Sequence, residues 1–137
     1  MAKESGLGMT VTVDDSAGSG QAISNDVTSV AITMPSGVQD ITGVNSSGME
    51  RLLLIADLTV TLGGVFNKAA SLSHAVFKNY RTLAGSQVGR TTAIVHSGQT
   101  LSDEILYTDY SLNRPISGEL TWSAPGSLPD GGVPAWS

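Results

Sequence analysis

The chain has 137 residues, the size of one ordinary domain, and 40% of them are apolar, so it can bury a core. Its net charge of −5 and its seven scattered Lys and Arg residues disfavour nucleic-acid binding, which needs clustered basic side chains. The absence of cysteine excludes disulfides, thiolate metal sites and a cysteine nucleophile.

Only 14% of the residues are charged, well below the roughly one quarter typical of soluble domains. Such a surface suits a protein that is largely covered by its neighbours, although a secreted β domain can have the same composition. The first residues lack an apolar signal core, and no apolar run approaches membrane-spanning length. We therefore expect a protein that is made in the cytoplasm, has no membrane partner, and stays soluble until it meets a partner.

Alternating apolar and polar residues predict two strands near the start of the chain. Residues 9–14 place Met9, Val11 and Val13 on one face. Residues 27–34 place Val30 and Ile32 inward and end before Pro35, which cannot donate to a ladder.

A capping box predicts a short helix around residues 47–53. Ser47 and Glu50 have the required spacing, and the helix would turn Met49, Leu52 and Leu53 toward the core. Residues 54–62 alternate as a strand, which we expect to end at the following glycine pair, residues 63–64.

Helical spacing of apolar positions 72, 75, 76, 80 and 83 predicts a helix within residues 69–83. Residues 81–90 are expected to form a polar loop. Residues 91–96 then form a strand, residues 97–98 a turn, and a further strand continues through residue 112.

Turn residues at 113–118, with Pro115 and Gly118, lead into a last strand at 119–123 that turns Leu120 and Trp122 inward. The pattern predicts a single domain over residues 1–137, with a flexible N-terminal arm at 1–8 and an extended C-terminal arm at 124–137. The fold class is mainly β, a sandwich or barrel-like sheet of about six or seven strands with one or two short flanking α-helices. Pairing with a neighbouring subunit is one way to cover its open edges.

Chemical motifs are scarce. The two histidines, His74 and His96, have no metal-ligand spacing, and nothing resembles a phosphate-binding loop. A Ser–His–Asp set could be drawn from Ser73, His74 and Asp57, but no strained turn presents the serine as a nucleophile. We predict no enzyme activity, no cofactor and no metal.

Several polar strand faces carry threonine beside single acids: Asp57 with Thr59 and Thr61, and Glu119 with Thr121. These faces are either an ordinary solvated surface or the wall of a channel.

Several stretches together resemble the major tail (tail tube) proteins of long-tailed, non-contractile bacteriophages. The resemblance covers most of the chain. It rests on these segments: Asp40-Ile-Thr-Gly-Val44, Ser47-Gly-Met-Glu-Arg-Leu52, Thr61-Leu-Gly-Gly-Val-Phe-Asn67, Ser73-His-Ala-Val-Phe77, Thr108-Asp-Tyr-Ser-Leu-Asn-Arg114, Gly118-Glu-Leu-Thr-Trp122 and Asp130-Gly-Gly-Val-Pro-Ala-Trp136.

The resemblance implies a structural subunit of the virion tail. Hexameric rings would join their inner strands into a continuous barrel and stack into a tube that carries DNA during ejection. The other partners would be the tape measure, tail terminator and baseplate or tip proteins. Copies that each carry a net charge of −5 would give a negative lumen that repels DNA phosphates.

We expect the lumen to be lined by acids and threonines of the polar faces: Asp57, Thr59, Thr61, Asp109, Glu119 and Thr121. Contacts between subunits or rings are expected from the loops at 15–20 and 81–90 and from the end of the chain: Asp15, Ser16, Gly18, Gly20, Arg81, Gly85, Arg90 and Trp136.

Two other functions remain open on the sequence. A capsid decoration or cement protein would also be small, β-rich and free of cysteine. A carbohydrate-binding β domain of a tail tip would need exposed aromatic residues, and this chain has only seven aromatic residues in total (Trp 2, Tyr 3, Phe 2).

Overall fold

A computed structural model describes residues 3–83 and 89–137 of the chain. The described residues form ten strands: β1 (Thr10–Asp14), β2 (Gly20–Ala22), β3 (Val27–Thr33), β4 (Ser36–Asp40), β5 (Arg51–Ala56), β6 (Thr59–Val65), β7 (Arg90–His96), β8 (Gln99–Tyr107), β9 (Ser111–Asn113) and β10 (Thr121–Ser127). One short helix, α1 (Ser73–Phe77), and two 3₁₀ turns, η1 (Ser24–Asp26) and η2 (Tyr80–Leu83), complete the elements. The mainly β prediction is confirmed.

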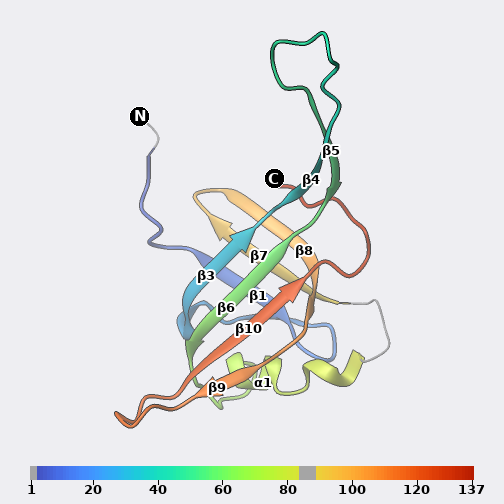
Figure 1. The fold of residues 1–137 in the computed structure, drawn as a ribbon. Coiled ribbons are helices and arrows are strands. Elements are labelled where there is room, and N and C mark those ends of the chain that lie inside the picture. Colours follow the sequence, from blue (N-terminus) through green and yellow to red (C-terminus); the bar gives the residue numbers. More distant parts are fainter. Residues whose placement is uncertain (1–2, 84–88) are drawn as a thin grey trace.

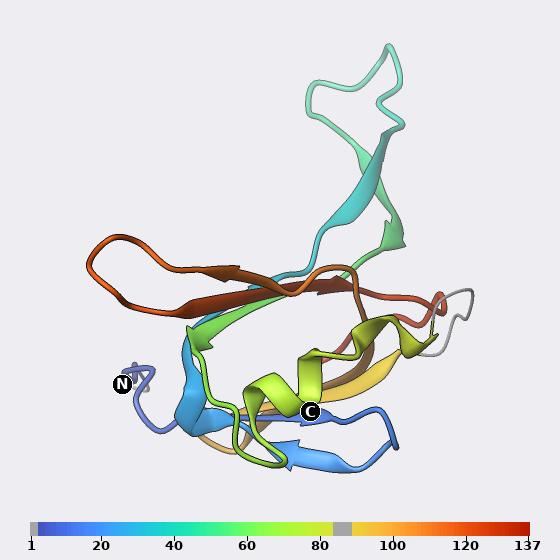
Figure 2. The same ribbon diagram turned by 90° about the horizontal axis from the view of Figure 1, so that it is seen from below.

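Eight strands form one antiparallel sheet that folds over on itself. The strand order is β2-β1-β7-β8-β10-β6-β3, with β9 pairing β10 beside β8. Strand β8 joins the two halves, because it pairs with β7 along Gln99–Ile105 and with β10 only at its end, Leu106 and Tyr107. The result is a sandwich with β1, β2 and β7 in one layer and β3, β6, β9 and β10 in the other (Figure 2).

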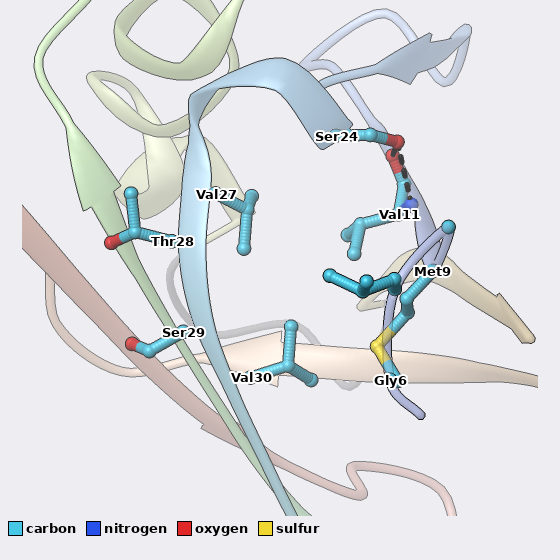
Figure 3. A pocket seen from close by; sticks show the side chains of 10 residues that line it. Gly6, Met9, Val11, Ser24, Val27, Thr28, Ser29 and Val30 are labelled. Carbon is cyan, nitrogen blue, oxygen red and sulfur yellow. Dashed lines mark hydrogen bonds between the residues drawn. The ribbon is translucent and has the colours of Figure 1, made fainter. Parts of the chain in front are cut away.

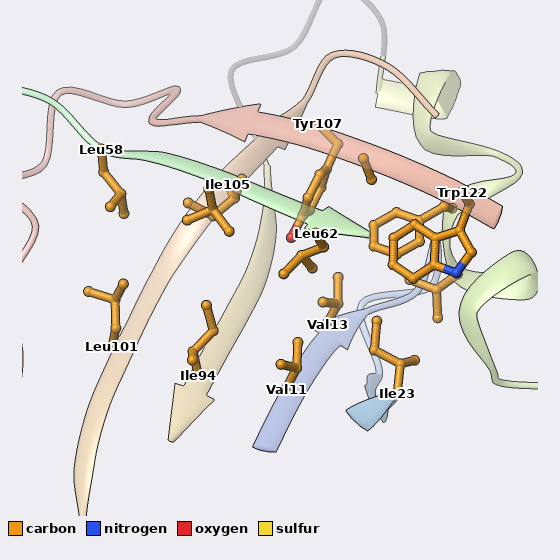
Figure 4. Packing of buried hydrophobic residues seen from close by; sticks show 14 residues of the cluster. Val11, Val13, Ile23, Leu58, Leu62, Ile94, Leu101, Ile105, Tyr107 and Trp122 are labelled. Carbon is orange, nitrogen blue, oxygen red and sulfur yellow. The ribbon is translucent and has the colours of Figure 1, made fainter. Parts of the chain in front are cut away.

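The core fills the space between these layers (Figure 4). Strands β1 and β7 contribute Val11, Val13 and Ile94 from one side, and β6 and β10 contribute Leu62 and Trp122 from the other. Each of these side chains is buried. They alternate with exposed or half-buried residues along their strands, except in β6, where the buried Gly63 and Gly64 follow Leu62. The period-2 patterns in the sequence therefore correctly identified the inward faces.

Helix α1 closes one end of the sandwich by burying Val76 and Phe77 (Figure 1). The carboxylate of Asp26 holds its first turn, since Asp26 Oδ2 accepts from the Ser73 amide at 3.2 Å. The Arg90 guanidinium holds its other end by donating to the carbonyl oxygens of Val76 and, at 3.0 Å, Asn79. Buried polar groups satisfied in this way fix a short helix that its own length could not stabilise.

Strands β4 and β5 form a separate two-stranded hairpin that projects away from the sandwich (Figures 1 and 2). We call residues 35–57 the arm. The arm leaves the molecule at the end opposite α1 (Figure 1). The predicted helix around residues 47–53 is wrong, because Arg51–Ala56 is a strand and Leu53 is 78% exposed.

Other predicted boundaries also shift. The strand predicted at 54–62 is two strands, and β6 continues through Gly63 and Gly64 to Val65. The helix predicted within 69–83 shrinks to the five residues of α1 and the four of η2. The strand predicted to reach residue 112 ends at Tyr107, and β9 follows separately.

The C-terminal arm predicted from residue 124 begins later. Strand β10 runs on through Ala124, Pro125 and Gly126 to Ser127, and Ala124 and Gly126 are buried. Pro125 fits because β10 pairs only with β6 at this position: β9 ends opposite Ser123, and β8 joins opposite Gly126. The extended segment is therefore 128–137.

Candidate assembly surface

The outer face of the layer β3-β6-β10-β9 consists of small, uncharged side chains. Register places Thr33, Thr59 and Ser127 in one cross-strand row, and Ala31, Thr61 and Pro125 in the next. Directly opposed residues in an antiparallel pair point to the same face, so each row shares one surface.

We call this surface the Ser/Thr face. Its members come from four strands: Ser29, Ala31, Thr33, Thr59, Thr61, Gly63, Val65, Ser111, Asn113, Thr121, Ser123, Pro125 and Ser127. None of these residues carries a charge.

The structure separates the six predicted lumen residues into two groups. Thr59, Thr61 and Thr121 lie on the Ser/Thr face. Asp57, Asp109 and Glu119 are all exposed but lie outside the strands, in the links that precede β6, β9 and β10. Each acid accepts a hydrogen bond from its own link, the amide of Leu58 at 2.7 Å, the amide of Tyr110 at 2.8 Å and the hydroxyl of Ser117 at 2.9 Å. The acids thus border an uncharged face.

The layer has two margins, β3 and β9, whose outer edges pair with no other strand among residues 3–83 and 89–137. Beside β3, a groove of about 400 Å³ separates this strand from the segment 6–9. Figure 3 shows Val27 and Val30 of β3 pointing into the groove, with Met9 and Val11 on the other side. An open strand edge beside apolar side chains is a site for the addition of another strand.

Strand β9, at the opposite margin of the layer, also exposes apolar side chains. Leu112 pairs with Trp122, so it points to the inner face of the layer, yet it is 47% exposed. Ile116, in the turn between β9 and β10, is fully exposed. The sequence prediction missed both residues, although Leu112 and Ile116 are apolar positions in an otherwise polar stretch.

The arm exposes apolar side chains on both of its faces. Val38 pairs with Leu53 and shares its face, whereas the neighbouring Leu52 pairs with Gln39 on the other face. Val38, Leu52 and Leu53 are 52%, 49% and 78% exposed. An isolated two-stranded hairpin is marginally stable in water, and a surface of this kind normally contacts another molecule.

The loop predicted for ring contacts at residues 15–20 is a tight turn organised by Asp15. Its Oδ1 accepts from the amides of Ala17 at 2.9 Å and Ser19 at 3.0 Å, and its Oδ2 accepts from Gln21 at 3.1 Å. These hydrogen bonds lower the pKa of the Asp15 carboxyl, and the bond from the Ser19 amide contributes most. Ser16, Gly18 and Gly20 are exposed around this turn.

The other predicted contact loop, 81–90, contains residues of three kinds. Arg81 is exposed, and Gly85 lies outside the described residues. Arg90 is only 4% exposed and is used within the chain to hold α1. We therefore no longer expect Arg90 to contact another subunit.

Trp136 returns to its own sandwich. It forms a β-bridge with Leu101, and Ser137 exchanges two backbone hydrogen bonds of 2.8 Å with Thr100. The indole remains 45% exposed and lines a shallow depression with Met9 and His96.

The residues considered for catalysis do not converge. The Nδ1 atom of His74 lies 3.1 Å from the hydroxyl of Tyr110, and Asp57 stands at the base of the arm, at the other end of the molecule from α1 (Figure 1). Within residues 3–83 and 89–137, no group of three or more His, Cys, Asp or Glu side chains is placed to hold a metal ion. In the same part of the chain, no helix has the length and apolar character to cross a bilayer.

The fold has counterparts in known structures, although no protein-family model matches the sequence and no curated protein matches it. A chain from the tail of an empty gene transfer agent (GTA) particle, refined with helical and C6 symmetry, superposes with a TM-score of 0.72 at 18% identity. The match covers 98% of this chain and 99% of that chain.

Two further structures agree. A chain from the virion of a native gene transfer agent particle has a TM-score of 0.71 at 15% identity, with 98% and 99% of the two chains covered. A chain from the six-fold symmetrised baseplate of the anti-feeding prophage has a TM-score of 0.60 at 10% identity, with 92% of each chain covered. At these identities the likeness is one of fold, and it extends over nearly the whole chain.

Proposed function

We propose that the protein is a structural subunit of a virion tail, in which hexameric rings stack into a tube that conducts DNA. The observation that carries this proposal is the near full-length fold likeness to a chain from a tail with C6 helical symmetry. Two features of this chain support it independently: a layer with two open margins, and an uncharged face between them.

Ring closure is proposed to join β9 of one copy to the open edge of β3 in the next. Val30 pairs with the buried Leu62 and therefore points inward, as Leu112 does beside Trp122. Pairing of the two margins would bring Leu112 against Val30 and fill the groove beside β3. A contact between two different surfaces closes into a ring when the rotation between copies allows it.

The same pairing would join the Ser/Thr faces of all copies into one continuous wall. We assign this wall to the lumen, because a conduit must not bind the phosphates that pass along it. Hydroxyl and methyl groups offer no cation to DNA, in contrast to the Lys and Arg of a binding surface. Asp57, Asp109 and Glu119, at the borders of the face, would add negative potential that repels phosphate.

Further tail components are part of the proposal. A stack of rings leaves one unsatisfied surface at each end, since contacts between unlike surfaces propagate until another protein caps them. Terminator and baseplate or tip proteins would occupy these ends, and a tape measure protein would occupy the lumen. Ser16, Gly18, Gly20 and Arg81, which are exposed, remain candidates for contacts between rings, and so does the part of Trp136 that is exposed.

Negative-stain electron microscopy of the purified protein over a range of concentrations tests the proposal. The tail tube function predicts six-membered rings and hollow tubes. Trimers or monomers that bind a capsid shell would instead indicate a decoration protein. Compact particles that bind a glycan array would indicate a carbohydrate-binding tail-tip domain.

A further inference from the structure

Exposed basic and acidic residues are concentrated at opposite ends of the molecule. No Asp or Glu occurs between Asp57 and Asp103, and three of the seven basic residues, Lys68, Lys78 and Arg81, lie in the segment around α1 and η2. All three are exposed. We call residues 66–81 the helical end.

Acids near this end offset only part of its charge. The buried Asp26 carboxylate accepts from Asn67 Nδ2 at 3.0 Å and from the Ser73 amide at 3.2 Å, both within the helical end. Asp14 ends β1 and Asp15 begins the adjoining turn, which touches the helical end where Asn79 Nδ2 donates to the Ser16 hydroxyl at 2.9 Å. The buried Arg90 guanidinium lies among these groups, because it donates to the carbonyl oxygens of Val76 and Asn79. Four basic residues therefore stand against three acids, and the exposed charges of the helical end itself, Lys68, Lys78 and Arg81, are all positive.

The arm has the opposite character. Within residues 35–57, Asp40, Glu50 and Asp57 are exposed, and the one basic residue is Arg51. The tip between β4 and β5 also exposes apolar residues: Val44 is fully exposed and Met49 is 58% exposed.

The tip is ordered before it meets a partner. The Thr42 hydroxyl donates to Asp40 Oδ1 at 2.6 Å and accepts from the Glu50 amide at 2.8 Å, so one side chain ties both strands together. The Ile41 amide donates to the Glu50 carbonyl at 2.9 Å, and the Ser46 hydroxyl donates to Glu50 Oε1 at 3.0 Å. A preorganised tip loses little entropy when it docks.

From these observations we infer that the arm tip of one copy docks on the helical end of another copy. The arm and the helical end lie at opposite ends of the molecule (Figure 1), so such a contact is head-to-tail and propagates as a filament. In this contact Asp40 and Glu50 lie against the basic side chains of the helical end. Val44 and Met49 pack on two exposed alanines, Ala69 and Ala70, which follow Lys68 in the sequence. This inference rests on the proposed function and identifies the contact that stacks one ring on the next.

Crosslinking tests the contact directly, because the chain has no native cysteine. Val44→Cys and Ala70→Cys are introduced together, tubes are assembled, and a short bis-maleimide crosslinker is added. Each copy then joins the next through a different residue, so a covalent ladder of many subunits is expected on a denaturing gel. Either single-cysteine variant gives at most dimers, and so does the matched pair Val44→Cys with Ser102→Cys, since Ser102 is exposed on β8, far from the proposed contact.

The outcomes separate the two claims. Tubes with a ladder support the contact, whereas tubes in which Val44→Cys/Ala70→Cys gives nothing above a dimer overturn it and leave the tail tube proposal standing. If the unmodified protein forms neither rings nor tubes, the proposed function fails, and the contact fails with it.

Charge reversal provides a second readout. Lys68→Glu with Lys78→Glu is expected to leave rings intact and abolish tubes at concentrations where the unmodified protein assembles, and unfolding should be unchanged because both side chains are exposed. The matched variant Lys3→Glu with Arg114→Glu makes the same change in net charge at other exposed sites and should still form tubes. Loss of tubes in both variants would show that net charge, and not this contact, controls stacking.

Discussion

The α-carbon of Gly64 lies against the backbone of Asp26: a β-carbon on Gly64 would be 1.8 Å from the Asp26 carbonyl oxygen. This close approach occurs where the register of β3 against β6 shifts between Val27 and Ser29. The Asp26 carboxylate, in turn, accepts from the Asn67 side chain at 3.0 Å and from the Ser73 amide. One glycine therefore lets β6 approach the turn that anchors α1.

Gly64→Ala should destabilise the fold by about 3 kcal/mol, the upper part of the range for overpacked sites, because the added methyl group would meet backbone atoms that cannot move aside alone. Urea unfolding followed by tryptophan fluorescence measures the change. Gly48→Ala is the matched control, since nothing lies within 4 Å of its added methyl group. Equal stability of the two variants would contradict the close approach.

Tyr107 predicts a loss of stability at high pH. Burial raises the pKa of its phenol far above the ordinary value of 10.0, against the smaller opposing effect of its 2.6 Å hydrogen bond with Thr92. Because the folded pKa is the higher one, the unfolded chain loses its proton first as pH rises. The free energy of unfolding should therefore fall above about pH 10, by up to ~1.4 kcal/mol per pH unit.

The measurement is the unfolding free energy as a function of pH in three proteins. Tyr107→Phe should flatten the alkaline fall, whereas Tyr80→Phe retains Tyr107 and should retain it. An unchanged alkaline slope in Tyr107→Phe would show that another group causes the loss.

Leu112→Asp tests the proposed ring margin. The side chain is 47% exposed in the single subunit, so the monomer should remain folded. In a ring the carboxylate would be buried against β3 without a partner, at a cost of about 3 kcal/mol, which is on the order of a hundredfold in affinity. Sedimentation velocity should show monomers where the unmodified protein forms rings. The control is Val133→Asp, at a 78% exposed apolar residue of the C-terminal segment, which should still form rings. Ring formation by Leu112→Asp would show that β9 lies outside the interface.

Lysines on the Ser/Thr face test the lumen. Thr59→Lys with Thr61→Lys should allow tubes to assemble, because neither residue is at a margin of the layer. The added cations would bind phosphates and slow DNA ejection at least several-fold, with a delay that shrinks as salt rises. Ser102→Lys places the same cation on exposed β8 and should eject normally. Normal ejection by the double lysine variant would place the lumen elsewhere.

Periodicity predicted the strands of the core well. Residues such as Val11, Val13, Val60 and Trp122 alternate with polar neighbours, and burial on one face of a strand imposes that alternation. The same alternation correctly placed Thr59, Thr61 and Thr121 on the outward face of their strands.

The prediction for the arm was wrong because local sequence spacing does not show that these residues form a hairpin that projects from the sandwich. Ser47 and Glu50 have capping-box spacing, yet Glu50 serves the tip of a hairpin and Leu52 and Leu53 point to solvent in the single subunit. Residues 52–55 are all apolar and therefore show no alternation, as is typical of a strand that is covered on both faces. The glycine pair predicts a strand end, whereas Gly63 and Gly64 lie inside β6, where the close packing of β3 leaves no room for side chains.

The predicted acids and Arg90 illustrate a second limit. Alternation placed Asp57, Asp109 and Glu119 on strand faces, but the strands begin just after them. Arg90 was placed in a polar loop because charge usually marks exposure, whereas its guanidinium finds two carbonyl oxygens at the end of α1. Such long-range partners depend on the folded topology.

A cryo-electron microscopy reconstruction of assembled tubes would show directly how the copies are joined. We expect sixfold rings in which β9 of each copy pairs with β3 of the next, with Thr59 and Thr61 on the inner wall. A reconstruction with the Ser/Thr face turned outward, or with β3 and β9 left unpaired between copies, would rule out this arrangement.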